Sequence, residues 1–316
     1  MMVAAVLASY AMVAALVLPR LLSQEEWAER APRLAIAVWL AACASVVASA
    51  IFSALAVAIP ATVIGHGLAG IFEACADVLS DGAALTSPLT RAALAGAALI
   101  AARVTYCGAA IVVRARWERR RHADMLNLLG RHDGELDAVV LDHDEAAAYC
   151  LPGREGKAVI TTAALRSLAP EQVAAVLAHE QAHLRGRHHL VLAAAETFCR
   201  AFPRLSLFAL ARGEVARLIE LLADDVAARH HPRIHIAAAL VWLGTGRAPA
   251  FMLGAGGASA LTRVRRMLSP AVPLRRRERI AGFAAVAFLL AGPVAVAAIP
   301  GLSSFLAHRC HNISIF

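Results

Sequence analysis

The sequence has little charge and few aromatic side chains for its length. Of its 316 residues, 17% are charged and 5% are aromatic, whereas 59% are hydrophobic. The mean hydropathy is +0.63. Because soluble domains are usually about 45–50% apolar, a protein that lies wholly in water is excluded. Part of the chain is therefore expected to contact lipid.

Lysine is nearly absent, since Lys157 is the only lysine among 31 basic residues. The net charge is still +8 at pH 7, a balance that nucleic-acid-binding proteins also show. Much of this charge lies at the ends of apolar segments, where membrane proteins carry it, so we expect no direct nucleic-acid binding. The sequence also lacks an internal repeat. Its glycine-rich stretch at 253–260 lacks a Walker lysine, which argues for a flexible connection rather than a phosphate loop.

Four apolar segments are long enough to cross a bilayer, because ~20 apolar residues span ~30 Å of hydrocarbon. They cover roughly residues 2–17, 34–59, 92–113 and 280–299. The first segment lacks a basic region before it and is followed by Pro19 and Arg20 rather than a cleavage site. We therefore expect a retained helix and not a signal peptide.

Arginines between these segments predict the orientation. The loop at 60–88 contains no Lys or Arg, whereas five arginines follow the third segment and RRRER precedes the fourth at 275–279. The positive-inside rule then places both termini outside the plasma membrane. We expect three spans in 1–113, a cytoplasmic domain in 114–279, and a fourth span with a short external tail in 280–316.

The cytoplasmic segment has its own pattern of elements. Residues 114–129 are typical of a basic helix that continues from the membrane, and short β-prone runs within 136–161 predict a sheet of two or three strands. From Ala169 the pattern is helical, and a further helix is expected over 213–229. The apolar stretch at 190–212 is interrupted by charges, which favours a packed or interface-lying helix pair over a re-entrant segment.

The most informative motif is HEQAH, at residues 179–183. Residues four apart share one face of a helix, so His179 and His183 can both bind one Zn²⁺ through nitrogens at ~2.0–2.1 Å. Glu180 is offset around the helix and can reach a water on the ion, as zinc hydrolysis requires. The apolar run VAAVLA before the motif suits a buried zinc helix. Two surface histidines on an ordinary helix are the alternative.

A catalytic zinc needs a third protein ligand and one open position. The downstream carboxylates are Glu196, Glu214, Glu220, Asp224 and Asp225. Leucines and an isoleucine flank Glu220, and an acidic residue in such company needs a partner. Asp224 shares its helix face and can orient a ligand histidine. We predict Glu220 as ligand and Asp224 as orienting residue, with Glu196 pointing away on a continuation of the HEQAH helix; an acid on a solvated face is the alternative.

HEQAH, followed by ELLAD at 220–224, resembles the gluzincin-type membrane metallopeptidases. These include the heat-shock membrane protease, the CAAX prenyl protease and the beta-lactam-responsive antirepressor peptidases. Residues 148–180 also look like their strand-turn-strand-helix entry into the active-site helix. The four-span plan looks most like the antirepressor group without its extracellular sensor domain, because 16 residues follow Pro300. The resemblance implies a mainly α fold: a four-span helical bundle with a cytosolic, zincin-like α+β peptidase domain carrying a small β-sheet.

The resemblance also implies an endopeptidase that cleaves a protein substrate, in that group often a small helix-turn-helix repressor or the protease itself. We expect one Zn²⁺ per chain, held by His179, His183 and Glu220, to lower the pKa of its water from about 15.7 towards ~7. Glu180 would accept the proton and pass it to the leaving amine. Four further histidines could stabilise the oxyanion, or could be solvated or orienting residues: His188, His189, His230 and His231.

Several alternatives stay open at the level of sequence. A constitutive quality-control protease would cleave many membrane proteins, whereas a regulated one would cleave one partner. A non-catalytic transducer with structural zinc would not need Glu180. A homo-oligomer is compatible with the sequence, and we expect any signal to enter through residues 60–90, the helices or a partner.

Two further features lie in or beyond the apolar segments. Arg103 lies near the centre of the third span, where a charge costs at least ~2.5 kcal/mol. It is either a pairing or signal-coupling site within the bundle or an arginine that faces a polar cleft over the active site. A span whose true bounds are shifted along the sequence is a further alternative. The six cysteines lack a CxxC pattern, which argues against a zinc ribbon. Cys75 and Cys310 are both expected outside, where a disulfide between them can persist, free thiols being the alternative.

Overall fold

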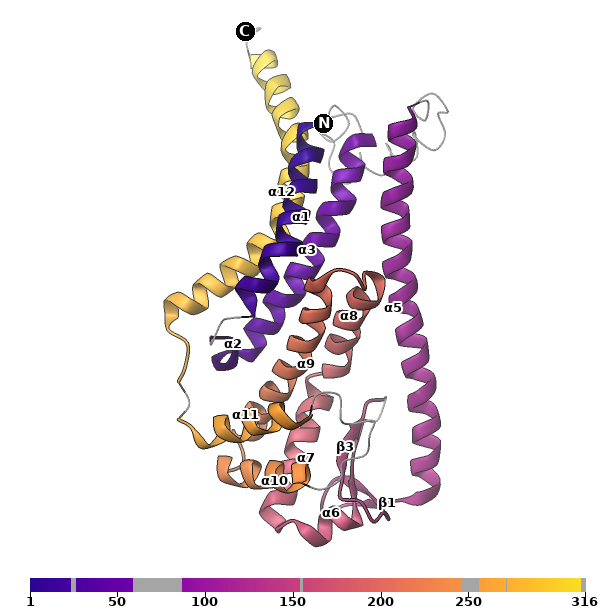
Figure 1. Ribbon diagram of the computed structural model, residues 1–316, viewed down its shortest axis with the longest axis vertical. Coiled ribbons are helices and arrows are strands. Elements are labelled where there is room, and N and C mark those ends of the chain that lie inside the picture. Colours follow the sequence, from indigo (N-terminus) through magenta and orange to yellow (C-terminus); the bar gives the residue numbers. More distant parts are fainter. Residues whose placement is uncertain (24–26, 59–86, 154–155, 246–255, 271, 314–316) are drawn as a thin grey trace.

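The structure of the protein is a computed structural model in which a bundle of long helices joins a domain with a small sheet (Figure 1). It describes residues 1–23, 27–58, 87–153, 156–245, 256–270 and 272–313.

Within these described residues, four helices are long and apolar enough to cross a membrane, as the sequence predicted. They are α1 (Met2–Leu22), α3 (Pro32–Ala58), α5 (Pro88–Leu129) and α12 (Arg276–Ile313). α3 lies between the others and contacts all three (Figure 1). A short helix, α2 (Trp27–Arg30), stands between α1 and α3. This arrangement fits a multi-pass membrane protein.

α5 is a single continuous helix of 42 residues, about 63 Å long. Its first half is apolar, and its second half carries the arginines that follow Val113. The predicted basic helix over 114–129 is therefore confirmed as the lower part of α5. In Figure 1 this helix runs along one side of the molecule from the bundle down to the sheet.

The sheet has four strands, in the order β1-β2-β4-β3. Their bounds are β1 (Gly130–Asp133), β2 (Ala138–Leu141), β3 (Ala148–Leu151) and β4 (Lys157–Thr161). β2 and β4 pair in parallel, whereas β1 and β3 pair antiparallel to their neighbours. β3 is consequently an edge strand.

The sequence predicted two or three strands and did not predict β1. The strand GRHD has no β-branched or aromatic residue and exposes Arg131 and His132. It forms because the chain turns back from α5 and pairs with β2, where Arg131 lies opposite Val140. An exposed edge strand of this kind carries no hydrophobic alternation that a sequence pattern could reveal.

Six helices complete the domain. They are α6 (Thr162–Ser167), α7 (Pro170–Arg185), α8 (His188–Ala201), α9 (Ser206–Ala227), α10 (Arg233–Thr245) and α11 (Gly256–Leu268). α7 begins with a proline at its first position, where the missing N–H costs nothing. Val173, Val176 and Leu177 of α7 pack on one face of the sheet, and Leu126 of α5 packs on the other.

Residues 253–260, expected as a flexible connection, are partly helical. Gly256 is the first residue of α11, so residues 256–260 form the first turn of that helix. Residues 253–255 lie outside the described part of the chain. Alanine, which occurs here at positions 258 and 260, has the highest helix propensity of all residues.

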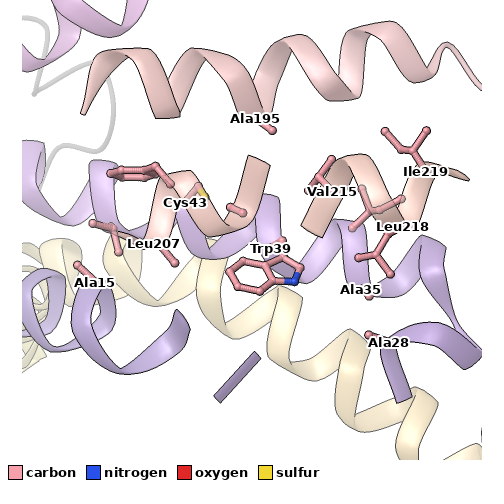
Figure 2. Packing of buried hydrophobic residues seen from close by; sticks show 14 of the residues in the cluster. Ala15, Ala28, Ala35, Trp39, Cys43, Ala195, Leu207, Val215, Leu218 and Ile219 are labelled. Carbon is pink, nitrogen blue, oxygen red and sulfur yellow. The ribbon is translucent and has the colours of Figure 1, made fainter. Parts of the chain in front are cut away.

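α8 and α9 form an antiparallel helical hairpin that packs against the long helices. The turn between the two helices falls at residues 202–205, and the hairpin contacts α1, α3 and α5. Trp39 of α3 and Phe208 of α9 are almost fully buried in the shared core, and Figure 2 shows Trp39 lying close to the α9 residues Leu218 and Val215. A packed helix pair is therefore present, but its second helix is not separate from the helix expected over 213–229, because both belong to α9 (Ser206–Ala227). The pair begins at His188 and not at residue 190. The preference for this pair over a re-entrant segment stays a prediction.

Arg103 connects α5 to the end of this hairpin. Its guanidinium Nε donates a hydrogen bond to the carbonyl of Ala201, the last residue of α8. The last carbonyls of a helix have no partner within the helix, and the helix dipole favours a cation there. Arg103 therefore pairs with a backbone carbonyl inside the helix bundle. This agrees with the prediction of a pairing site within the bundle.

Candidate active site

α7 brings its two motif histidines together. His179 and His183 are one helical turn apart, and their Nε2 atoms lie 3.1 Å from each other. His179 is buried and His183 is partly buried. The apolar face of α7 beside them packs on the sheet, so the helix is fixed where its histidines face α9.

Glu220 of α9 meets this pair. Its Oε2 lies 3.5 Å from Nε2 of His179, and its Oε1 lies 3.5 Å from Nε2 of His183. A tetrahedral zinc site with bonds of ~2.0–2.1 Å has ligand atoms roughly 3.3–3.4 Å apart. The observed separations of 3.1, 3.5 and 3.5 Å fit such a site. Among the described residues, these three side chains form the group that could hold a metal ion.

Each histidine of the pair also has a contact on its other nitrogen. Nδ1 of His179 lies 2.9 Å from Oδ1 of Asp224, although the ring N–H does not point straight at that oxygen. Nδ1 of His183 lies 3.0 Å from Nδ1 of His188, which is buried. Such contacts fix the orientation of a metal-binding imidazole. Asp224 and His188 are therefore placed to orient the pair, and His188 lies behind His183 rather than beside an oxyanion.

The sequence did not reveal Arg263, which lies on α11. Its guanidinium holds both oxygens of Asp224, at 2.7 and 2.8 Å, and lies 3.0 Å from Oε2 of Glu220. The Asp224 side chain is fully buried, so this bidentate pair supplies the partner that its charge requires. Arg263 follows the glycine-rich stretch and sits in no recognisable motif. Only the packing of α11 on α9 brings it to the site.

Glu180 lies next to His179 on α7 and faces the edge strand β3. Its carboxylate contacts the thiol of Cys150. Burial raises the pKa of Glu180, and the nearby His179 partly opposes this effect. Burial likewise raises the pKa of the Cys150 thiol to about 12, so the thiol is neutral. A carboxylate with a raised pKa can both accept and return a proton.

The charges around the pair suit a divalent cation. Ionised Glu180, Glu220 and Asp224 carry three negative charges, and Arg263 carries one positive charge, which leaves a balance of −2 when both imidazoles are neutral. Uncompensated charge in a buried site is costly. Two imidazole nitrogens and one carboxylate also form a ligand set found in catalytic zinc sites. Geometry and charge therefore both fit Zn²⁺.

The pKa shifts of the metal-free site follow from the same contacts. Burial alone would lower the pKa of His179, but its contacts with the carboxylates of Asp224 and Glu220 raise it to about 10. Burial, reinforced by the charge of His179, lowers the pKa of His183 to about 4. Burial would raise the pKa of Glu220, but contacts with His179 and Arg263 lower it to about 2. A proton on His179 thus supplies positive charge when no metal is bound.

The other candidate carboxylates are engaged elsewhere. Glu214 pairs with Arg217 at 2.9 Å, and Asp225 pairs with Arg266 at 2.8 Å. The expectation that Glu196 continues the HEQAH helix is wrong, because Gly186 ends α7 and the chain turns before α8 begins. Glu196 instead forms ion pairs with two arginines of the hairpin, Arg200 and Arg212.

The remaining histidines do not join the cluster. His230 and His231 line a small cavity of about 250 Å³. The α7 residues that line this cavity include Ala178 and Gln181 but neither His179 nor His183. His230 is exposed there, and its role as an oxyanion donor stays a prediction. His189 lines a different and larger cavity.

The structure describes the side chains of four of the six cysteines. Cys43, Cys107, Cys150 and Cys199 are free thiols. The expected bridge between Cys75 and Cys310 falls on side chains outside the described residues.

Comparison with known proteins adds an independent finding. No solved structure matches the chain. The sequence model of Peptidase family M48 matches residues 113–218. This segment contains the four strands, α7 and the HEQAH motif. The match ends two residues before Glu220, so the third candidate ligand rests on the geometry alone. Residues 113–218 are thus similar to the peptidases of family M48.

Proposed function

We propose that the protein is an integral-membrane zinc endopeptidase that hydrolyses a protein substrate. The observation that carries this proposal is the meeting of His179, His183 and Glu220 from two helices, with Glu180 beside them. The match to a peptidase family over 113–218 and the four apolar helices support it.

The chain supplies each role that the reaction needs. His179, His183 and Glu220 would hold Zn²⁺, which when bound lowers the pKa of a water molecule and polarises the scissile carbonyl. Glu180 accepts the proton of the attacking water and returns it to the leaving amine. Asp224 and His188 keep the two imidazoles in position, and Arg263 fixes Asp224 and Glu220.

We further propose that the peptidase domain faces the cytoplasm of a cell whose plasma membrane holds the four spans, with both termini outside. The arginine-rich lower half of α5 and the basic start of α12 support this orientation by the positive-inside rule. The short helix α2 lies at the same end of the bundle (Figure 1), and Arg20 and Arg33 flank it in the sequence.

The biological role that we propose is regulated proteolysis, with a transcriptional repressor of the helix-turn-helix class as one candidate substrate. The four-span plan that resembles the antirepressor peptidases supports it. Contacts between the first loop and the site support it further: Glu29 of α2 pairs with Arg217 of α9 at 2.7 Å. Because Arg217 lies one turn before Glu220, a shift of the spans could reach the metal ligand through this pair.

A substrate trap tests the proposal. The Glu180→Ala protein should keep its metal and its fold and retain the uncleaved substrate during purification. Recovery of one small DNA-binding protein would support regulated proteolysis, whereas recovery of many unrelated membrane proteins would favour constitutive quality control. If the wild-type protein contains zinc but shows no cleavage of any trapped protein, a non-catalytic transducer is the better account.

A further inference from the structure

A cavity of about 850 Å³ lies between the lower half of α5, the start of α8 and the β3–β4 turn. It is separate from the metal cluster, although His189 on its wall follows His188. Ligand sites in proteins have volumes of roughly 300–1,000 Å³. The cavity is therefore large enough for a small molecule or a headgroup.

The wall of this cavity is basic. Arg116, Arg119, Arg120 and Lys157 line it, and its described lining includes no aspartate or glutamate. Among the residues that the structure describes, no carboxylate pairs with any of these four side chains. Unpaired positive charge that gathers around a cavity attracts an anion.

His189 points to the same kind of ligand. Its side chain lines the cavity beside Leu190 and Ala193. Burial and then the charge of Arg119 lower the pKa of His189, so the ring lies in the positive field of the cavity. A neutral imidazole can donate a hydrogen bond from its ring N–H to an anionic oxygen.

The cavity lies at the level where α5 leaves its apolar segment. Gly108 faces Thr197 and Arg103 faces Ala201, so α5 and α8 run antiparallel in a fixed register. Continuing that register places Ala193 beside Val112, and both residues line one end of the cavity. That end is apolar and adjoins the part of α5 expected within the bilayer.

Charge and depth along α5 match a lipid headgroup layer. Arg116 lies roughly 5 Å and Arg120 roughly 10 Å beyond Val113 along the helix axis. The headgroup layer on each side of a bilayer is about 5–8 Å thick, and arginine side chains extend towards it. On the same stretch Trp117 is 58% exposed and carries Arg121 over its ring. Exposed tryptophan is typical of the membrane–water interface.

We propose that this cavity binds the headgroup of an anionic phospholipid. The phosphate would lie among Arg116, Arg119 and Arg120 with His189 as an additional donor. The acyl chains would leave past Val112 and Ala193. A soluble anion would not need the apolar end of the cavity, and an acidic protein segment would not need a site that adjoins the spans. The proposal does not depend on peptidase activity.

The experiment uses the purified full-length protein in detergent, with native mass spectrometry to count bound lipid. Phosphatidylglycerol is titrated as the anionic probe and phosphatidylcholine as the zwitterionic one. The cavity variant is Arg116→Gln/Arg120→Gln, since both side chains are exposed and their loss should leave the fold intact. The control variant is Arg114→Gln/Arg121→Gln, which removes the same charge from α5 outside the cavity lining.

We expect the wild type to bind one phosphatidylglycerol per chain in preference to phosphatidylcholine. Because each basic residue near a membrane surface contributes about fivefold in affinity, the cavity variant should bind roughly 25-fold more weakly. The control variant should bind like the wild type. Equal loss in both variants would show a general effect of surface charge and overturn the proposal.

Two further titrations separate the other sources of negative charge. Inorganic phosphate and an acidic peptide of glutamate residues are titrated into the lipid-free protein and into both variants. If either binds with the same dependence on Arg116 and Arg120 while phosphatidylglycerol does not bind, the cavity serves that ligand and the lipid proposal fails. Zinc content, measured on the same samples, should be the same in all variants.

Discussion

Arg263 and Asp224 form a two-pronged ion pair, with N–O distances of 2.7 and 2.8 Å, although 39 residues separate them in the sequence. Asp224 in turn lies 2.9 Å from Nδ1 of His179. α11 thus reaches the proposed metal site both through Asp224 and directly, since Arg263 also lies 3.0 Å from Oε2 of Glu220. The geometry of the site therefore depends on a helix that carries no recognisable motif.

Replacing Arg263 with methionine should weaken zinc binding about 10–100-fold, the usual effect of losing a residue that orients a ligand. It should also lower the free energy of unfolding by about 3–5 kcal/mol, because Asp224 is left buried without its cation. Arg263→Lys should have an intermediate effect, since lysine keeps the charge but not the two-pronged contact. Competition with a zinc chelator measures the affinity.

The control for this prediction is Arg265→Met on the same helix, where the side chain is exposed. It should leave zinc affinity and stability unchanged. An equal loss in both variants would mean that α11 contributes through its overall charge and not through the contact with Asp224.

Glu180→Gln should retain stoichiometric zinc and lose cleavage by at least about 100-fold, because general-base catalysis contributes 10²–10⁴-fold. Glutamine keeps the size of the side chain but cannot accept the proton. Metal analysis and cleavage of the trapped substrate measure the two properties separately. A Glu180→Gln protein that cleaves at the wild-type rate would exclude Glu180 as the base.

Glu220→Gln should lower the zinc content well below one per chain, because an amide oxygen is a weaker zinc ligand than a carboxylate. Glu214→Gln provides the matched control. Glu214 lies on the same helix, six residues earlier, and pairs with Arg217 instead of with the histidines. Equal zinc content in the two variants would contradict the assignment of Glu220.

Zinc binding to the metal-free protein should release a proton and tighten with pH. The pKa of His179 is raised to about 10 and that of His183 is lowered to about 4, so at pH 7 only His179 must lose a proton to bind the ion. The affinity should therefore rise about tenfold per pH unit between pH 6 and 9. Calorimetry in two buffers of different ionisation enthalpy counts the protons. Binding that is independent of pH over this range would contradict the contact between His179 and Asp224.

Arg103→Met should destabilise the α8–α9 hairpin by about 1.5–3 kcal/mol, the contribution of a hydrogen bond from a charged group. The carbonyl of Ala201 would lose its donor at the end of α8. Arg91→Met, an exposed arginine near the start of the same helix, is the control. Thermal unfolding of the purified protein in detergent should shift to lower temperature in Arg103→Met only.

The sequence was sufficient to predict features that depend on residues close together in the chain. The four apolar helices follow from hydropathy, and the approach of His179 to His183 follows from the helical period. The approach of Asp224 to a ligand histidine was predictable, because Asp224 lies four residues from Glu220 on the same face of a helix. Each of these predictions uses residues within one or two turns of a helix.

Features that depend on contacts between distant segments were not predictable. Arg263 reaches the site only because α11 packs on α9, and no local pattern distinguishes it from Arg265 or Arg266. The break between α7 and α8 depends on Arg187, a non-glycine residue with a φ of 48°, which sequence propensity does not favour. β1 owes its existence to its pairing with β2.

X-ray absorption at the zinc edge of the purified full-length protein tests the central claim most directly. We predict one zinc per chain, bound by two imidazole nitrogens and by oxygen at ~2.0–2.1 Å, with no sulfur neighbour. A sulfur shell at ~2.3 Å would point to a cysteine such as Cys150 and contradict the assignment of the site. The absence of stoichiometric metal would contradict it as well.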